Sequence, residues 1–129
     1  MSADNLSGSW TGIFNYPRGL PSTGFTATLR DVGGVLAGET LEPRYDGTAM
    51  LSALVDGRRS GVEVTFVKVY DALDGEHDSV RYQGSVDVTG LEIAGRWDIP
   101  NVWSGSFIMV RDGTVVAEVE AEVVEAVAR

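Results

Sequence analysis

Apolar and polar residues alternate with a period of two along most of this chain, in short runs separated by turn-forming residues every 10 to 15 positions. Alternation of this kind is typical of β-strands with one buried face. The pattern therefore predicts an all-β fold with eight strands. Their expected positions are 8–15, 24–31, 35–42, 48–56, 61–70, 79–87, 91–98 and 103–111.

One set of alternate positions in each segment is the candidate inner face. The set is mainly apolar, with recurring glycines and three charged residues. It comprises Trp10, Gly12, Phe14, Phe25, Ala27, Leu29, Leu36, Gly38, Thr40, Glu42, Val62, Val64, Phe66, Lys68, Val80, Tyr82, Gly84, Val86, Leu91, Ile93, Gly95, Trp97, Trp103, Gly105, Phe107, Met109 and Arg111. The glycines favour sharply coiled strands in a small closed barrel. In segment 48–56 either face can be the inner one, because the apolar residues alternate poorly.

The connections alternate in length. Short turns are expected at 31–34, 57–60 and 87–90, and longer loops at 16–23, 43–47, 71–78 and, more modestly, 99–102. In an up-and-down antiparallel barrel every second connection lies at the same end. Trp10 and Arg111 then meet at the short-turn end, where the guanidinium can lie over the indole and close the barrel. A ligand is expected to enter at the long-loop end.

The chain divides into a barrel domain, 1–113, and an acidic, valine-rich tail, 114–129. Val116, Val119, Val123 and Val127 form a helical stripe, but the same segment also alternates valine or alanine with glutamate as a strand does. Helix and strand both remain open. We expect the tail to contact the barrel wall or a second subunit, which makes a homo-oligomer an expected partner.

Composition narrows the function classes. The 129-residue chain has a net charge of −9 and no cysteine. The charge disfavours nucleic acid and anionic membranes as partners, since phosphate groups need a basic face. The absence of cysteine excludes disulfides and thiolate metal sites. No signal-like or membrane-spanning segment is visible, so we expect a cytoplasmic protein.

Metal and cofactor signals are weak. His77 is the only histidine, and one histidine cannot form a multi-histidine zinc site. The acidic residues Asp71, Asp74, Glu76 and Asp78 lack the spacing of an EF-hand calcium loop. We expect a solvated acidic loop, no metal and no cofactor.

The Gly8-Ser9-Trp10 opening, the eight-strand meander and the arginine in the last strand resemble the calycin superfamily of lipocalins, fatty-acid-binding proteins and avidins. Chain length and short turns are most similar to the avidin branch. Segment 34–38 resembles the third-strand motif of that branch, and segment 61–66 resembles its fifth strand. The resemblance implies that Phe66 takes the place of a biotin-stacking tryptophan, and that Tyr82 and Trp97 take those of two further pocket aromatics.

The same resemblance does not imply biotin binding. The positions that would bond the biotin ureido and carboxylate groups fall on Gly12, Thr40 and Glu42, and on Asp78 and Val80. Most of the hydrogen-bonding side chains are therefore missing. An unpaired buried polar group costs about 1–3 kcal/mol, so biotin would bind weakly if at all.

Six residues are candidate ligand contacts at the long-loop end. Aromatic rings can stack a flat or apolar molecule, and an inward carboxylate and ammonium can anchor its polar part. The residues are Phe66, Tyr82, Trp97, Trp103, Glu42 and Lys68. Each also has a purely structural interpretation, because aromatic residues fill any small barrel and charged ones can extend to water at the rim.

Three function hypotheses follow. The favoured one is a non-enzymatic barrel that binds a small, partly apolar or aromatic molecule. The second is a small-barrel isomerase or cyclase that uses Glu42 or Asp78 with Tyr82 as acid and base. The third is an assembly module with a filled barrel and an oligomerising tail. No catalytic residue is assigned, because serines without a nearby base or oxyanion motif give little support to nucleophilic catalysis.

Overall fold

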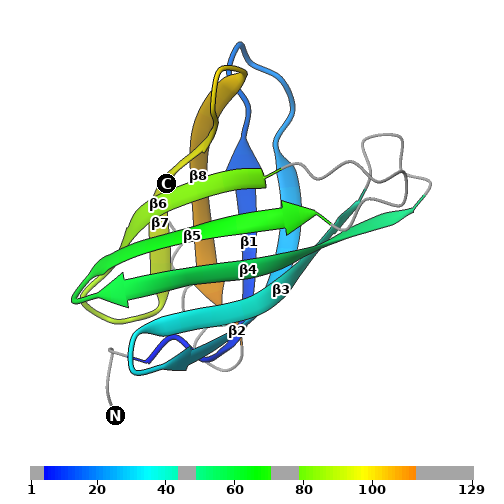
Figure 1. Cartoon of the computed structure of the whole chain (residues 1–129). Helices are drawn as coiled ribbons and strands as arrows, with labels where there is room; N and C mark the ends of the chain where they lie inside the picture. Colours follow the sequence, from blue (N-terminus) through cyan, green and yellow to red (C-terminus); the bar gives the residue numbers. More distant parts are fainter. Residues whose placement is uncertain (1–4, 44–48, 71–78, 113–129) are drawn as a thin grey trace, which may run out of the picture.

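The computed structural model describes residues 5–43, 49–70 and 79–112. The strands are β1 (Gly8–Asn15), β2 (Thr23–Val32), β3 (Val35–Pro43), β4 (Met50–Ser60), β5 (Glu63–Tyr70), β6 (Ser79–Val86), β7 (Glu92–Ile99) and β8 (Trp103–Arg111). Each pairs antiparallel with the next in chain order, and the sheet closes into a barrel (Figure 1). The predicted all-β meander barrel is confirmed.

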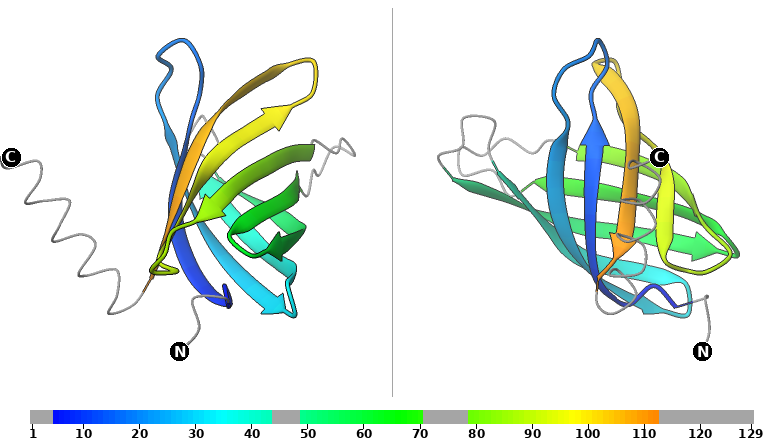
Figure 2. Two further views of the ribbon diagram at one scale, coloured as in Figure 1. Left: turned by 90° about the vertical axis from the view of Figure 1, so that its left-hand side faces the viewer. Right: turned by 180° about the vertical axis from the view of Figure 1, so that it is seen from behind.

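Closure is made by β1 and β8. Their register runs from Trp10 opposite Arg111 to Asn15 opposite Ser106. The two strands lie side by side in both Figure 1 and the rear view of Figure 2. All eight strands therefore have two hydrogen-bonded neighbours, and the described sheet has no free edge.

The pleat separates a buried inner face from a solvated outer face. Phe25, Ala27 and Leu29 on β2 are buried, while the residues between them are exposed. In β4, whose inner face the sequence left open, Ala53 and Val55 point inward and Leu54 is 64% exposed on the outer face. Cross-strand pairing with β3 and β5 decides this register.

The structure corrects one predicted turn. Residues 57–60 do not turn: β4 continues to Ser60, which pairs with Glu63, and the chain reverses at Gly61-Val62. Gly61 takes a positive φ of 61°, which glycine adopts without strain. Val62 was expected inside, but it lies in this turn and is 55% exposed.

Mid-strand glycines permit close strand approach. A side chain at Gly38 would collide with the carbonyl oxygen of Thr28 on β2, and one at Gly105 would collide with that of Asn15 on β1. Glycine at these positions therefore lets neighbouring strands approach closely, as a small coiled barrel requires.

The short-turn end is sealed by the segment before β1. Leu6 is fully buried, and its carbonyl accepts a hydrogen bond of 3.0 Å from Trp10 Nε1. The Arg111 guanidinium lies 4.9 Å from the Trp10 ring and donates to the carbonyl of Asn5 at 2.6 Å. Asp31 on β2 accepts from the Leu6 amide at 3.0 Å and pairs with Arg59.

In the part of the chain that the structure describes, no helix has the length and apolarity to cross a membrane. The tail 114–129 lies outside the described residues, as do His77 and the acidic positions at 71–78.

Candidate functional site

The opposite end of the barrel holds a buried pair of opposite charges. Glu42 is the penultimate residue of β3, and Lys68 is two residues from the end of β5. Both side chains point inward, as the alternation predicts. Lys68 Nζ donates to Glu42 Oε1 at 3.1 Å, and Lys68 is only 1% exposed. The two residues that the sequence placed on one face thus form a direct ion pair.

Aromatic residues enclose this pair. Tyr70, the last residue of β5, donates from its hydroxyl to Glu42 Oε1 at 2.7 Å. The Lys68 Nζ lies 4.7 Å from the ring centre of Phe14, 5.2 Å from Phe25, 5.0 Å from Tyr70 and 5.1 Å from Tyr82. Cation–π attraction at these distances favours the ammonium form.

Burial dominates the protonation of the cluster. Removal from water lowers the pKa of Lys68 below its ordinary value, although the charge and hydrogen bond of Glu42 act in the opposite direction. Burial, together with the Glu42 charge, raises the pKa of Tyr70 and of Tyr82. Both phenols are therefore neutral near pH 7, and the Tyr70 hydroxyl is a stable donor to the carboxylate.

Thr40 contributes a further polar group to the interior. It lies two residues before Glu42 on β3 and is buried. Its Oγ1 has no hydrogen-bond partner among the residues that the structure describes. A buried hydroxyl normally has a partner, so this atom is available to a bound molecule.

The predicted aromatic contacts lie on neighbouring strands. Phe66 and Tyr82 stack with ring centres 4.7 Å apart. Trp97, which pairs with Tyr82 across β6 and β7, donates from Nε1 to the carbonyl of Asn15 at 3.1 Å. Trp103 is 37% exposed and lies 6.1 Å from Trp97, edge to face.

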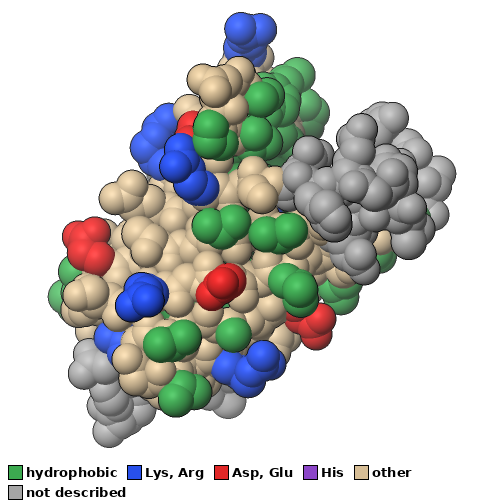
Figure 3. All heavy atoms as spheres, viewed as in Figure 1, with side chains coloured by type: hydrophobic (Ala, Val, Ile, Leu, Met, Phe, Trp, Pro, Cys, Tyr) green, Lys and Arg blue, Asp and Glu red, His purple; other side chains and the backbone are tan. Residues whose placement is uncertain are grey.

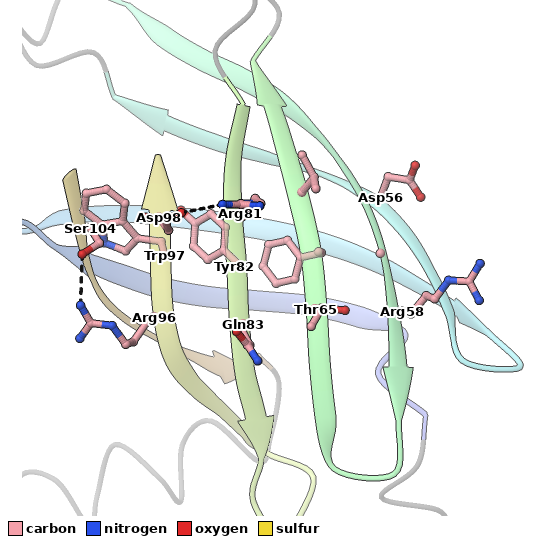
Figure 4. Close-up of a pocket in the computed structure, with 13 residues that line it drawn as sticks. Asp56, Arg58, Thr65, Arg81, Tyr82, Gln83, Arg96, Trp97, Asp98 and Ser104 are labelled. Carbon is pink, nitrogen blue, oxygen red and sulfur yellow. Dashed lines mark hydrogen bonds and ion pairs between the residues drawn. The ribbon is translucent and has the colours of Figure 1, made fainter. Parts of the chain in front are cut away.

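A groove of about 820 Å³ also exists, on the outer face of β4–β8. Its outward side chains include Arg58, Arg81 and Arg96, whereas the rings of Phe66 and Tyr82 behind it point into the barrel. Figure 4 shows Arg81 directed at Asp98, 3.1 Å away, and Arg96 at Ser104.

The face of the barrel seen in Figure 3 is mixed in character. Figure 3 shows hydrophobic, basic and acidic side chains interspersed over one face of the barrel. The charges of the Lys68 cluster differ from those on this face, because they are buried and paired with each other.

The structure includes interior residues that the sequence analysis did not select. Tyr70 continues the inward series Val64, Phe66, Lys68, and Asp31 continues the series before it on β2. Strict extension of the period-two pattern would have found both. Leu6 precedes the first strand, where no periodicity points to it.

The enzyme hypothesis paired Tyr82 with Glu42 or Asp78, and of these two carboxylates only Glu42 lies among the described residues. The hydroxyl bonded to Glu42 belongs to Tyr70, while Tyr82 stacks on Phe66. Asp78 lies outside the described residues. Among the described residues no cluster of histidine, cysteine or carboxylate side chains is suited to a metal ion.

The sequence matches no protein-family model and no curated protein. The chemistry of the site itself is therefore the basis for a functional proposal. Chemically, the cluster offers a carboxylate, an amine and a phenol in contact with one another within an aromatic wall, an arrangement that can hold a polar group of a small aromatic molecule.

Proposed function

We propose that this chain is a non-enzymatic binding protein whose barrel takes a small, partly aromatic molecule at the long-loop end. The observation that carries the proposal is the Glu42–Lys68 pair, which is buried inside the barrel among aromatic rings. A buried ion pair contributes little net stability compared with apolar residues of the same size. A binding role accounts for charged groups at this place in the core.

The chemistry of the ligand follows from the charge of the cluster. Glu42 and Lys68 neutralise each other, so a charged ligand would bring an uncompensated charge into the interior. A neutral molecule with a hydrogen-bonding group avoids this penalty. Its polar group would meet the Thr40 hydroxyl or the Glu42–Lys68 pair, and its apolar part would contact Phe14 and Phe25.

Kinship with calycins, and within them with the avidin branch, is part of this proposal. The barrel topology and the Trp10–Arg111 closure support the wider group. Phe66, Tyr82 and Trp97 form a continuous row across β5, β6 and β7, which supports the placement of pocket aromatics that the avidin resemblance implies.

A fluorescence titration with the neutral dye N-phenylnaphthylamine tests the proposal. Its emission rises in apolar surroundings, so we expect saturable binding to the full chain. The double variant Glu42→Leu with Lys68→Met removes both charges together and should weaken dye binding about tenfold, equivalent to about 1.4 kcal/mol.

The outer groove provides the matched control. Arg96→Gln changes an exposed groove residue and should leave the affinity unchanged. Affinity that depends on Arg96 and not on the Glu42–Lys68 pair would move the site to the outer face. Absence of saturable binding would contradict the proposal.

A further inference from the structure

Lys68 is the only lysine in the chain. A lone lysine at the protein surface would be ordinary, but this one is buried and its Nζ faces four aromatic rings. It also contacts a carboxylate that is itself bonded to a phenol. Lysines whose ammonium form is disfavoured by burial are the ones that react with carbonyl compounds.

We propose that Lys68 forms a reversible imine with a small aromatic aldehyde that enters the long-loop end of the barrel. This inference rests on the proposed function, because the aldehyde must occupy the same site. An aldehyde fits the cluster for three reasons. It is neutral, and its carbonyl carbon is an electrophile that an amine attacks, while its ring matches the surrounding aromatic wall.

The groups in contact with Nζ supply every proton transfer. The Lys68 ammonium first gives a proton to Glu42 across the 3.1 Å hydrogen bond, which leaves a neutral amine. The nitrogen lone pair then bonds to the carbonyl carbon, and the C=O π pair moves to oxygen. A second proton passes from nitrogen to that oxygen and gives a neutral carbinolamine.

Glu42 then returns its proton to the carbinolamine hydroxyl, the C–O bond breaks, and water leaves as the nitrogen lone pair forms the C=N bond. The products are a protonated imine, an ionised Glu42 and one water molecule. The Tyr70 hydroxyl stays bonded to Glu42 and holds the carboxylate beside the reacting nitrogen. The ion pair between nitrogen and Glu42 is the same before and after the reaction.

The protonation state of the amine supports this reaction. Burial lowers the pKa of Lys68, and each unit of lowering raises the neutral fraction near pH 7 about tenfold. An exposed lysine introduced into the chain by substitution would lack this advantage. Lys68 should therefore react faster than such a lysine despite its enclosure.

Reductive trapping on the full chain tests the proposal. The protein is treated with benzaldehyde and sodium cyanoborohydride, and the added benzyl group is located by peptide mass spectrometry. The internal reference is the lysine introduced by Arg30→Lys on the exposed outer face of β2. We expect modification of Lys68 to be at least about tenfold faster than at that reference.

Two variants define the mechanism. Lys68→Arg keeps the positive charge and should abolish the adduct within the barrel while leaving the reference lysine reactive. Glu42→Gln lowers the pKa of Lys68 further, but it removes the group that protonates the carbinolamine hydroxyl and should slow trapping at Lys68 about 100-fold, within the usual range for a general acid or base. Far-ultraviolet circular dichroism of each variant verifies that the barrel is folded.

The outcomes separate the two proposals. Modification of Lys68 that is no faster than at the reference lysine, or that is confined to the N-terminal amine, overturns imine formation. If the dye still binds in that case, the proposed binding function stands alone. If neither dye nor aldehyde binds, both proposals fail.

Discussion

At the scale of single residues, Lys68 and Glu42 show how a barrel interior can hold charge. Each ion loses its hydration, and the 3.1 Å bond between them and the Tyr70 hydroxyl replace part of it. The pair is therefore stable as a unit. Removal of one partner leaves the other buried without compensation.

This dependence predicts a non-additive effect on stability. Lys68→Met alone should lower the free energy of unfolding by about 3 kcal/mol, because Glu42 stays buried and unpaired. The double variant with Glu42→Leu should recover most of that loss. Denaturant unfolding of the two variants and the original chain measures the difference, and equal losses in both variants would contradict it.

Asp31 is a buried charged residue at the sealed end of the barrel, where it pairs with Arg59. Burial on its own would raise the pKa of its carboxyl group, but hydrogen bonds from the Leu6 amide, from Arg59 and from the Gly34 amide outweigh burial and hold the pKa below its ordinary value of 3.8. A group with a lowered folded pKa stabilises the fold fully above its unfolded value. That contribution is lost as the pH falls through the folded value.

Asp31→Asn should therefore destabilise the fold by about 3 kcal/mol near neutral pH and by progressively less in acid. The measurement is the urea midpoint as the pH is lowered through and below 3.8. Asp98→Asn is the control, because the Arg81–Asp98 pair is exposed and should contribute less than about 1 kcal/mol. A parallel pH dependence in the Asp31 variant and the original chain would refute this role.

At the scale of elements, the strands approach closely where glycine removes the Cβ atom. Gly38 on β3 and Gly105 on β8 each face a carbonyl oxygen of the neighbouring strand. Their placement on different strands distributes the curvature around the barrel. Close approach of this kind suits a small closed sheet, in which β1 pairs with β8.

Gly38→Ala should destabilise the barrel by about 1–3 kcal/mol, because the added methyl group meets backbone that cannot rotate away. Gly24→Ala on β2 is the matched control. A side chain there lies 3.8 Å from its nearest neighbour, an ordinary contact. Thermal unfolding of both variants decides the point, and equal midpoints would argue against a packing role for Gly38.

The sequence was sufficient to predict the strands because inner and outer residues alternate in almost every element. Glu42 and Lys68 were placed inside by that rule, but the register sets them opposite different residues of β4, Leu51 and Val55, and their contact depends on the shape of the closed barrel. The turn after β4 could not be placed in this way. Val62 continues the phase of Val64 and Phe66, so only the pairing of Ser60 with Glu63 shows that the chain has already turned.

Tertiary contacts also decided what periodicity left open. Leu6 precedes β1 and belongs to no alternating pattern. Its backbone is held by hydrogen bonds with Trp10 on β1 and Asp31 on β2. The bond from Tyr70 to Glu42 depends on the stagger between β3 and β5, two strands apart in the barrel. Such relations require the closed sheet.

At the scale of the whole molecule, the two ends of the barrel differ in chemistry. One end is closed by Leu6, Trp10 and Arg111 through hydrogen bonds to the backbone. The other carries Glu42, Lys68 and Tyr70 within aromatic rings. If the barrel binds a ligand as we propose, the first end stabilises the fold and the second end contacts the ligand.

The indole N–H signals in a ¹⁵N NMR spectrum test this assignment most directly. Trp97 bonds to Asn15 at the long-loop end, and Trp10 bonds to Leu6 at the short-turn end, so each end has its own reporter. On titration with N-phenylnaphthylamine, we expect a saturable shift of the Trp97 signal and none of Trp10. Saturable binding that leaves Trp97 unmoved, or that moves Trp10 instead, would contradict it.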